Sequence, residues 1–164
     1  MYKRQILLGS SIIERYPKNL IPNSLNLGIS GLTSDELIQK YYLLPPSNQY
    51  QNIVLYIGSN DITHTQNTVQ QIYTNITEFI LHYLPQNKNI ILIAILKSPK
   101  RTTSQINKII LINRKLREFS QKYPNIHFCN LNRELSSPSN YLPDKVHISE
   151  KGYSIMSNKV LQMI

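Results

Sequence analysis

The sequence predicts an α/β fold in which a five-stranded parallel sheet carries helices on both faces. Three observations support this prediction. Five short apolar runs have the length and composition of strands. Segments with apolar residues at helical spacing alternate with these runs, and parallel strands need such crossover connections. One run, residues 89–96, is apolar almost throughout, as expected for a central strand buried on both faces.

A short strand and a tight turn open the predicted fold. Residues 5–8 lack a helical period, and Gly9 with the two serines after it predicts a turn. One helical turn is expected over residues 12–16, because Pro17 stops a longer helix. Taken by itself, Ser11 is better explained as a turn residue or a helix N-cap than as a catalytic group.

The next segment repeats this order of strand, loop and helix. Residues 24–27 predict the second strand, which ends in the loop of residues 28–31. Thr33 and Glu36 have the capping-box pattern that begins a helix. Apolar residues continue this helix at the expected spacing: Leu37, Ile38, Tyr41 and Leu44.

The third and fourth strands flank the clearest predicted helix. Residues 52–57 form an apolar, β-branched run that ends in the loop of residues 58–61, and residues 89–96 form the fourth strand. Between them, one apolar stripe predicts a helix that Pro85 closes. The stripe consists of Val69, Ile72, Tyr73, Ile76, Phe79, Ile80, Tyr83 and Leu84.

A helix, a strand and a second helix complete the prediction. Apolar residues from Ile106 to Phe119 mark the first of these helices. Asn113 lies inside this stripe and must find a buried hydrogen-bond partner, so we interpret it as structural. Residues 126–129 predict the fifth strand, and the last helix begins near Ser149, a predicted N-cap.

Length and composition predict one domain. The 164 residues, 41% of them hydrophobic, suffice to bury a single core. The composition does not shift along the chain, and no repeat, linker or low-complexity tract divides it. We therefore expect a single domain over residues 1–164.

The net charge of +9 is concentrated in residues 97–122. Such a stretch fits either a solvated helix face or a nucleic-acid footprint. We favour the solvated face, because no aromatic-basic interleaving or binding motif accompanies the charge. The basic residues are Lys97, Lys100, Arg101, Lys108, Arg114, Lys115, Arg117 and Lys122, opposed only by Glu118.

Two features predict a cytoplasmic protein without a transmembrane segment. Residues 1–4 are basic, but the apolar run behind them is too short for a signal peptide or a membrane span. Cys129 is the single cysteine, which rules out an intramolecular disulfide and fits a reducing compartment. We expect Cys129 to be buried in the fifth strand. The oligomeric state is not predicted.

Polar residues follow the predicted strands at the points where the strands end. Ser11 follows the first strand, Gly31 the second and Asn60 the third, and residues 144–147 lie between the fifth strand and the last helix. Parallel α/β sheets bind ligands outside the carboxyl ends of their strands. These residues are therefore expected to face one site.

The residue types at this predicted site match the needs of a serine nucleophile. Such a serine needs a base, a carboxylate that orients the base, and hydrogen-bond donors for the oxyanion. His147 is the candidate base, and Asp144, three residues earlier, can reach its second ring nitrogen. Gly31 offers a backbone N–H and Asn60 a side-chain amide. His64, shortly after Asn60, is the competing base.

These segments also resemble the sequence blocks of the SGNH (GDSL-type) hydrolases. They occur in the family's order and span essentially the whole chain, and the last, Asp-x-x-His followed by Ser-Glu-Lys-Gly-Tyr, is the most specific. The blocks are Gly9-Ser10-Ser11-Ile12, Ser30-Gly31, Gly58-Ser59-Asn60-Asp61 and Asp144-Lys145-Val146-His147.

The resemblance implies a flavodoxin-like, three-layer α/β/α sandwich and an enzyme that cleaves ester bonds. It implies Ser11 as the nucleophile, with Asp144 and His147 completing a catalytic triad. Gly31 and Asn60, together with the Ser11 N–H, are implied as the oxyanion hole. The resemblance implies no metal and no organic cofactor.

The sequence departs from the family pattern in two ways. The family usually has an aspartate before the nucleophile, where this chain has Ser10. The first crossover is also short, since Gly31 follows Ser11 by only 20 positions. A short crossover adds little wall to a substrate pocket, so we expect an open, shallow site that favours small acyl groups.

Two functional hypotheses follow from the sequence. The first is a serine hydrolase that cleaves a short-acyl or O-acetyl ester of a small molecule, carbohydrate or lipid through an acyl-enzyme on Ser11. The alternative is a catalytically weak or inactive module that binds nucleic acid or an anionic membrane through its basic surface. Salt-dependent binding without ester turnover distinguishes the second from the first.

Overall fold

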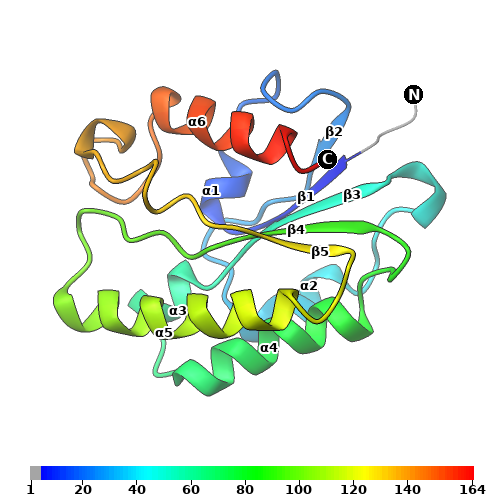
Figure 1. Ribbon diagram of the computed structural model, residues 1–164, viewed down its shortest axis with the longest axis horizontal. Helices are drawn as coiled ribbons and strands as arrows, with labels where there is room; N and C mark the ends of the chain where they lie inside the picture. Colours follow the sequence, from blue (N-terminus) through cyan, green and yellow to red (C-terminus); the bar gives the residue numbers. More distant parts are fainter. Residues whose placement is uncertain (1–4) are drawn as a thin grey trace.

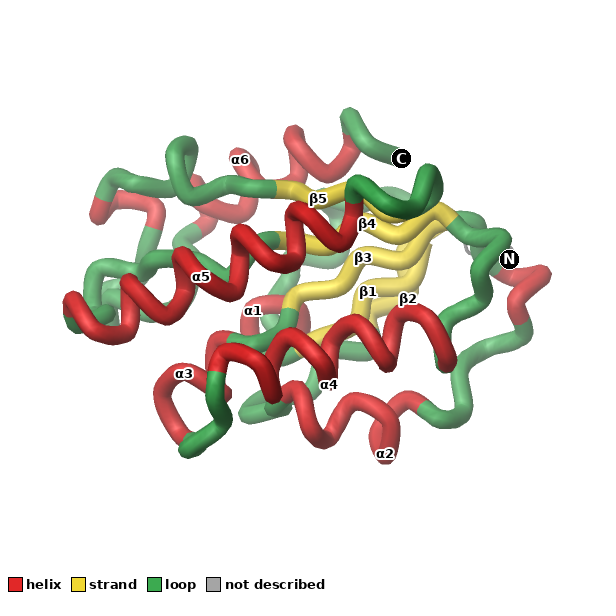
Figure 2. The backbone as a smooth tube through the Cα atoms, turned by 60° about the horizontal axis from the view of Figure 1, so that its bottom comes forward, coloured by secondary structure: helices red, strands yellow, loops and turns green. Residues whose placement is uncertain are grey.

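The computed structural model describes residues 5–164 as an α/β/α sandwich around a five-stranded sheet (Figure 1). All strand pairs are parallel, and their order is β2-β1-β3-β4-β5 (Figure 2). This is the flavodoxin-like order, so the predicted fold class is confirmed. The basic residues 1–4 lie outside the described part of the chain. The strands are β1 (Gln5–Gly9), β2 (Ser24–Asn26), β3 (Asn52–Tyr56), β4 (Asn89–Ile93) and β5 (Ile126–Cys129).

Helices cover both faces of the sheet. Helices α1 and α6 lie on one face, and α2, α4 and α5 lie on the other (Figures 1 and 2). No helix within residues 5–164 is long and apolar enough to cross a membrane. The helices are α1 (Ser11–Glu14), α2 (Leu37–Tyr41), α3 (Ser59–His64), α4 (Val69–His82), α5 (Thr103–Ser120) and α6 (Glu150–Leu161).

The sheet separates two apolar cores, because successive side chains of a strand point to opposite faces. In β4, Ile91 and Ile93 pack in the core that also holds Ile13 of α1 and Met156 of α6. Ile90 and Leu92 pack in the other core, against α2, α4 and α5. Both cores are buried almost completely, which accounts for the nearly continuous apolar sequence of β3 and β4. Cys129 is fully buried in β5, as predicted, and burial raises its pKa to about 11.

The fourth strand is shorter than the sequence predicts. The apolar run over residues 89–96 stays buried, but β4 ends at Ile93. Beyond that point the Asn113 side chain replaces the neighbouring strand: its Oδ1 accepts the Ile95 N–H at 2.9 Å, and its Nδ2 donates to the Ile95 carbonyl at 2.9 Å. Asn113 therefore has the buried partner that the sequence required, and it is structural.

Gly9, at the end of β1, occupies a position that no side chain fits. Its φ is +141°, and a Cβ added there would lie 2.0 Å from the Tyr56 carbonyl oxygen of β3. The backbone of β1 can therefore approach β3 closely only at a glycine. This close approach sets the point at which the chain leaves the sheet and enters α1.

Gly9→Ala is expected to lower the free energy of unfolding by about 3 kcal/mol, because it combines a steric clash with backbone strain. Urea denaturation followed by circular dichroism measures the loss. Gly31→Ala is the matched control, since Gly31 also has a positive φ (+80°) but, apart from its chain neighbours, no described residue has an atom within 4 Å of its added Cβ. The control is expected to lose only about 1 kcal/mol. Equal losses in the two variants would contradict the clash.

Candidate active site

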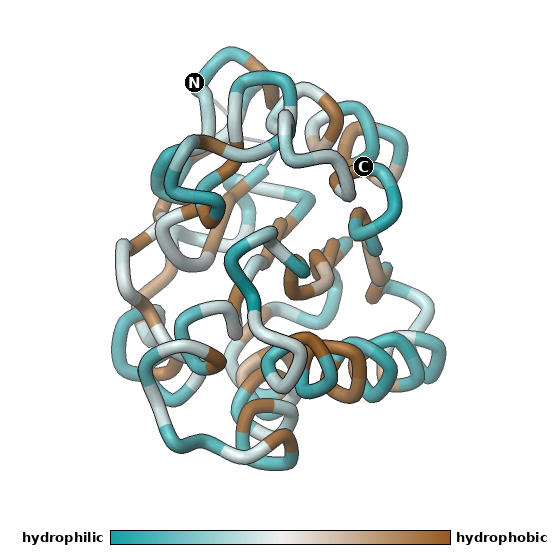
Figure 3. Tube along the Cα trace, turned by 90° about the vertical axis from the view of Figure 1, so that its left-hand side faces the viewer, coloured by the Kyte–Doolittle hydropathy of each residue, from teal (hydrophilic) through white to brown (hydrophobic). Residues whose placement is uncertain are grey.

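The loops after the strands lie at one end of the molecule, on the left in Figure 1. Figure 3 faces this end, where the loops in the foreground are largely hydrophilic. A cavity of about 390 Å³ opens here. Three of the sequence-predicted residues line it: Ser11 from α1, Asn60 from α3 and His147 from the loop before α6. Segments far apart in the sequence thus meet at one site.

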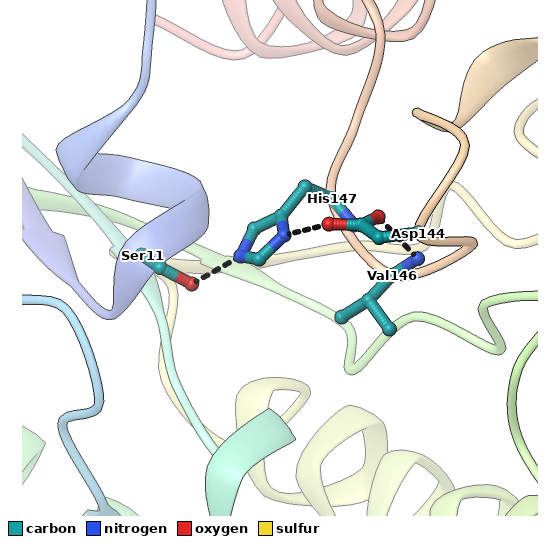
Figure 4. Close-up of polar contacts among 4 residues, drawn as sticks. All are labelled: Ser11, Asp144, Val146 and His147. Atoms are coloured by element: carbon teal, nitrogen blue, oxygen red, sulfur yellow. Dashed lines mark hydrogen bonds and ion pairs between the residues drawn. The ribbon is translucent and has the colours of Figure 1, made fainter.

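Ser11 is the first residue of α1, directly after the turn at the end of β1. Its Oγ lies 3.2 Å from Nε2 of His147, within hydrogen-bonding distance (Figure 4). The two residues are separated by 136 positions in the sequence. The fold therefore places a hydroxyl beside a nitrogen that can accept its proton.

Backbone hydrogen bonds hold the turn that presents Ser11. Ser10 is 1% exposed, and its N–H donates to the Tyr56 carbonyl of β3 at 3.2 Å. Its own carbonyl accepts the N–H groups of Ile13 and Glu14 at 3.0 Å each. The turn is thus fixed without a carboxylate at position 10.

Tyr41 of α2 connects this turn to the loop after β2. Its hydroxyl accepts the Gly9 N–H at 3.0 Å and donates to the Leu27 carbonyl at 2.7 Å. Burial raises the pKa of Tyr41, which keeps the phenol protonated and able to donate. The ends of β1 and β2 are therefore held together by one neutral side chain.

Asp144 holds the other ring nitrogen of His147. Its Oδ2 lies 2.5 Å from His147 Nδ1 (Figure 4), and its Oδ1 accepts the backbone N–H groups of Val146 and His147 at 2.9 and 3.0 Å. The hydrogen bond from the His147 ring, followed by the two backbone bonds, lowers the pKa of Asp144 well below its ordinary value. The carboxylate is therefore charged and fixes the imidazole with its proton on Nδ1 and its free lone pair toward Ser11.

The loop that carries Asp144 and His147 is closed by its own backbone. The Leu142 N–H donates to the His147 carbonyl at 2.8 Å, and the Lys145 N–H donates to the Leu142 carbonyl at 2.8 Å. Lys145 has a φ of 62°, a left-handed conformation that tightens the loop. Ser149 then caps α6, accepting the Gly152 N–H as predicted for an N-cap.

Asn60 lies in the first turn of α3, on the same cavity as Ser11. Its Nδ2 donates to the Leu32 carbonyl at 3.0 Å, and no other group within residues 5–164 accepts its second amide hydrogen. The neighbouring Asp61 is fully buried and accepts hydrogen bonds from the backbone and hydroxyl of Ser34 and from Asn67. Asp61 thus holds the loop, as predicted, and Asn60 faces the cavity.

Gly31 precedes Leu32 in the loop after β2 but does not line the cavity itself. Its φ of +80° turns the chain in a left-handed conformation. Within the described chain, neither its N–H nor that of Ser11 donates to another group of the protein. Both N–H groups are therefore available to a ligand.

The sequence profile of the GDSL-like lipase/acylhydrolase family matches residues 7–155. The chain belongs to this family. Its members are ester-hydrolysing enzymes, so the chain is an enzyme of that class. No curated protein matches the sequence.

Several solved structures share the fold of this GDSL family member. A lipolytic G-D-S-L family protein from Veillonella parvula is 18% identical, with 99% of this chain and 98% of that chain covered and a TM-score of 0.80. A GDSL-like lipase from Bacteroides thetaiotaomicron is 21% identical, with 98% and 87% covered and a TM-score of 0.81. A variant of an acetyl-xylooligosaccharide esterase from Geobacillus is 16% identical, with 98% and 93% covered and a TM-score of 0.79.

His64 is the second histidine on the cavity of this GDSL site. His64 lines the cavity at the end of α3, but the hydrogen-bond partner of the Ser11 hydroxyl is His147. Among residues 5–164, no three His, Cys, Asp or Glu side chains form a group that could hold a metal ion.

Sequence reasoning missed two basic residues of this GDSL site. Lys100 and Arg101, in the loop between β4 and α5, line the same cavity as Ser11. They belong to the basic stretch that the sequence analysis interpreted as a solvated helix face. They lie in the loop that follows the fourth strand at the carboxyl end of the sheet, and this was the signal that could have placed them at the site.

Proposed function

We propose that this GDSL family member cleaves carboxylic esters through an acyl-enzyme formed on Ser11. The observation that carries the proposal is the chain of hydrogen bonds from Ser11 through His147 to Asp144, with lengths of 3.2 and 2.5 Å. This is the arrangement that a serine nucleophile requires, with a base in contact and a carboxylate behind the base.

The first half of the reaction forms the acyl-enzyme. Ser11 Oγ attacks the ester carbonyl carbon while its proton passes to His147 Nε2, and Asp144 stabilises the resulting imidazolium. The tetrahedral intermediate then collapses: the bond to the alcohol oxygen breaks, and His147 gives its proton to the departing alcohol. The acyl group remains esterified to Ser11.

Water completes the reaction in the second half. His147 accepts a proton from a water molecule, whose oxygen attacks the acyl carbon of the ester on Ser11. Collapse of the second tetrahedral intermediate releases the carboxylic acid and returns the proton to Ser11. The same histidine thus serves as base and acid in each half.

The oxyanion of each intermediate requires donors that are already in place. We assign this role to the free N–H groups of Ser11 and Gly31 and to the second amide hydrogen of Asn60. The bond from Asn60 to the Leu32 carbonyl supports the assignment, because it fixes the amide next to the loop of Gly31.

Asn60→Ala is expected to lower kcat about 10²-fold, because it removes one oxyanion donor. Steady-state hydrolysis of p-nitrophenyl acetate measures the loss, and KM is expected to change little. Asn67→Ala is the control, since Asn67 supports the same region through Asp61 but does not line the cavity. An equal fall in kcat in both variants would show that the effect is structural.

We further propose that the substrate carries a short acyl group, such as acetyl. The short first crossover supports this, as does the cavity of about 390 Å³, which is near the lower end of the range of about 300–1,000 Å³ for small-molecule sites. The similarity in fold to an acetyl-xylooligosaccharide esterase is consistent with it.

The rate of hydrolysis is expected to fall with acyl length. Across p-nitrophenyl esters from acetyl to octanoyl, kcat/KM is expected to decrease about tenfold or more, because the longer chains are not enclosed by the cavity. A kcat/KM that rises steadily to octanoyl would instead indicate a long-chain lipase.

Covalent labelling tests the proposal as a whole. A fluorophosphonate probe is expected to add to the protein with a stoichiometry of about one. Trypsin releases residues 5–15 as one peptide, because Arg4 and Arg15 flank it, and fragmentation of this peptide separates an adduct on Ser11 from one on Ser10. Absence of labelling, or an adduct on another residue, would overturn the assignment.

A further inference from the structure

The cavity beside Ser11 has a cationic lining. Lys100 and Arg101 contribute fixed positive charge, and His64 and His147 are the other titratable side chains on its wall. In the described part of the protein, no aspartate or glutamate lines this cavity. Positive charge therefore predominates among the lining side chains, and the nearest acid of the site, Asp144, lies behind His147 and not on the cavity wall.

Among the described residues, Arg101 has no anionic partner. Its Nη2 donates to the Ser59 carbonyl at 3.1 Å and to the Ser59 hydroxyl at 2.6 Å, and its Nη1 donates to the Thr63 hydroxyl. All three acceptors are neutral. Its buried Nε has no acceptor, and no carboxylate within residues 5–164 forms an ion pair with it. Two of the five N–H groups of the guanidinium are thus unused.

Burial makes the missing counter-ion of Arg101 energetically unfavourable. Arg101 is half-buried, and desolvation lowers its pKa. A partly desolvated cation without a counter-ion destabilises a fold, so such a residue is usually paired with an acid. Arginine is also the side chain that best recognises planar or tetrahedral anions, since it presents several donors in a fixed geometry.

Ser98 provides a second, independent observation. It is 4% exposed and lines the same cavity, and its hydroxyl has no hydrogen-bond partner among the described residues. Buried hydroxyl groups are nearly always bonded. A buried unpaired donor next to an unpaired cation is the arrangement expected of a site that lacks its ligand.

Building on the proposed esterase function, we infer that this enzyme selects esters that carry a carboxylate or phosphate group, held in the cavity by Arg101 and Lys100. The acyl carbonyl lies at Ser11 while the anionic group lies toward the loop between β4 and α5. The substrate is thus a small anionic ester. The same molecule carries the carbonyl that reacts with Ser11 and the anionic group that Arg101 recognises.

A purely structural role explains only part of the evidence. Arg101 connects the loop after β4 to α3 through Ser59 and Thr63, and that connection would stabilise the site by itself. It does not account for the unpaired Ser98 hydroxyl, for Lys100 on the same wall, or for the absence of an acid there. A test must therefore separate ligand recognition from stability.

Matched acetate esters provide this test. The set is 4-acetoxybenzamide, which is neutral, 4-acetoxybenzoate, which carries a carboxylate, and 4-acetoxyphenyl phosphate. Each kcat/KM is divided by the rate constant for hydroxide-catalysed hydrolysis of the same ester, which removes the difference in leaving group. At least one anionic ester is expected to exceed the neutral one by about tenfold. The larger of the two anionic values distinguishes carboxylate from phosphate recognition.

Three variants assign the preference to the cavity. Arg101→Gln is expected to reduce the ratio of anionic to neutral kcat/KM to near one, and Arg101→Lys to retain part of it, because the charge remains. Arg114→Gln is the control, since Arg114 is a basic residue of α5 that does not line this cavity, and its ratio is expected to equal that of the wild type. A ratio unchanged in Arg101→Gln would overturn the inference.

Two further measurements cover failure of folding and failure of catalysis. If circular dichroism shows that Arg101→Gln is unfolded, the ratio is compared in Lys100→Gln and at rising ionic strength, where it is expected to fall. A ratio insensitive to both contradicts the inference. Calorimetry on Ser11→Ala compares the binding affinities of phenyl phosphate and benzoate with that of benzamide, independently of turnover. Neutral ester hydrolysis without anion preference overturns only this inference, whereas absence of both hydrolysis and labelling overturns the proposed function.

Discussion

Ser11→Ala is expected to lower kcat for p-nitrophenyl acetate by about 10⁴- to 10⁶-fold and to abolish fluorophosphonate labelling. The alanine has no oxygen to attack the carbonyl, and His147 loses the hydroxyl from which it accepts a proton at 3.2 Å. Residual hydrolysis is expected to come only from binding and the oxyanion donors. Burst-phase kinetics of the wild type, with one equivalent of p-nitrophenol released before steady state, would support the acyl-enzyme.

Ser10→Ala is the matched control for this prediction. It alters the adjacent serine in the same turn, yet the hydrogen bonds that hold the turn come from the Ser10 backbone, which alanine keeps. Labelling and kcat are therefore expected to stay within about threefold of the wild type. Labelling that survives in Ser11→Ala and disappears in Ser10→Ala would identify Ser10 as the nucleophile.

Where the family usually has an aspartate, this chain has Ser10, and backbone and tyrosine contacts hold the turn. Ser10 is buried, and Tyr41 reaches the turn from α2 to bond both Gly9 and the Leu27 carbonyl. Sequence patterns alone could not show this, because Tyr41 is 32 positions from Gly9 and fits equally well as an apolar residue of its helix. The consequence for catalysis is that the turn geometry does not depend on a charged group.

Local signals explain why much of the fold could be predicted. In the sequence, buried parallel strands are recognised by apolar, β-branched runs. The starts of helices are recognised by capping residues such as Thr33 with Glu36 and Ser149. Once the strands were located, the rule on carboxyl ends sufficed to group Ser11, Asn60 and His147. The structure shows these three on one cavity, while their catalytic roles are proposals.

Features that depend on distant contacts could not be predicted. Helix α3 was expected as a loop because its six residues are too few to show a helical period, and it begins after Gly58 in a left-handed conformation. Beyond the end of β4, the Ile95 backbone bonds to Asn113, which is 18 positions further along the chain. The position of Arg101 on the cavity likewise depends on its contacts with Ser59 and Thr63 of α3.

Asp144→Asn is expected to lower kcat about 10²- to 10⁴-fold. The asparagine can turn its amide toward His147 Nδ1 and donate to it, which favours the tautomer with the proton on Nε2, and that nitrogen can no longer accept from Ser11. We expect a fall in kcat nearer 10²-fold, because the Asp144 side chain is 45% exposed and water can partly replace the carboxylate. Kinetics on p-nitrophenyl acetate measure the loss, and Asp35→Asn, in an exposed acid outside the site, is the control.

The pH dependence of stability tests the contacts of the Asp144 carboxylate. The folded-state pKa of Asp144 lies below its ordinary value, so the carboxylate's contribution is complete above about pH 4 and is lost only as the pH falls toward the lowered value. Across the neutral range Asp144 is therefore ionised. The difference in free energy of unfolding between the wild type and Asp144→Asn is expected to shrink as the pH falls below about 4, because protonation of Asp144 removes the charge that the hydrogen bonds of His147 and Val146 stabilise. Urea denaturation at pH 3 to 7 measures this difference, and a difference that does not change with pH would show that the Asp144 carboxylate does not form these bonds in the folded protein.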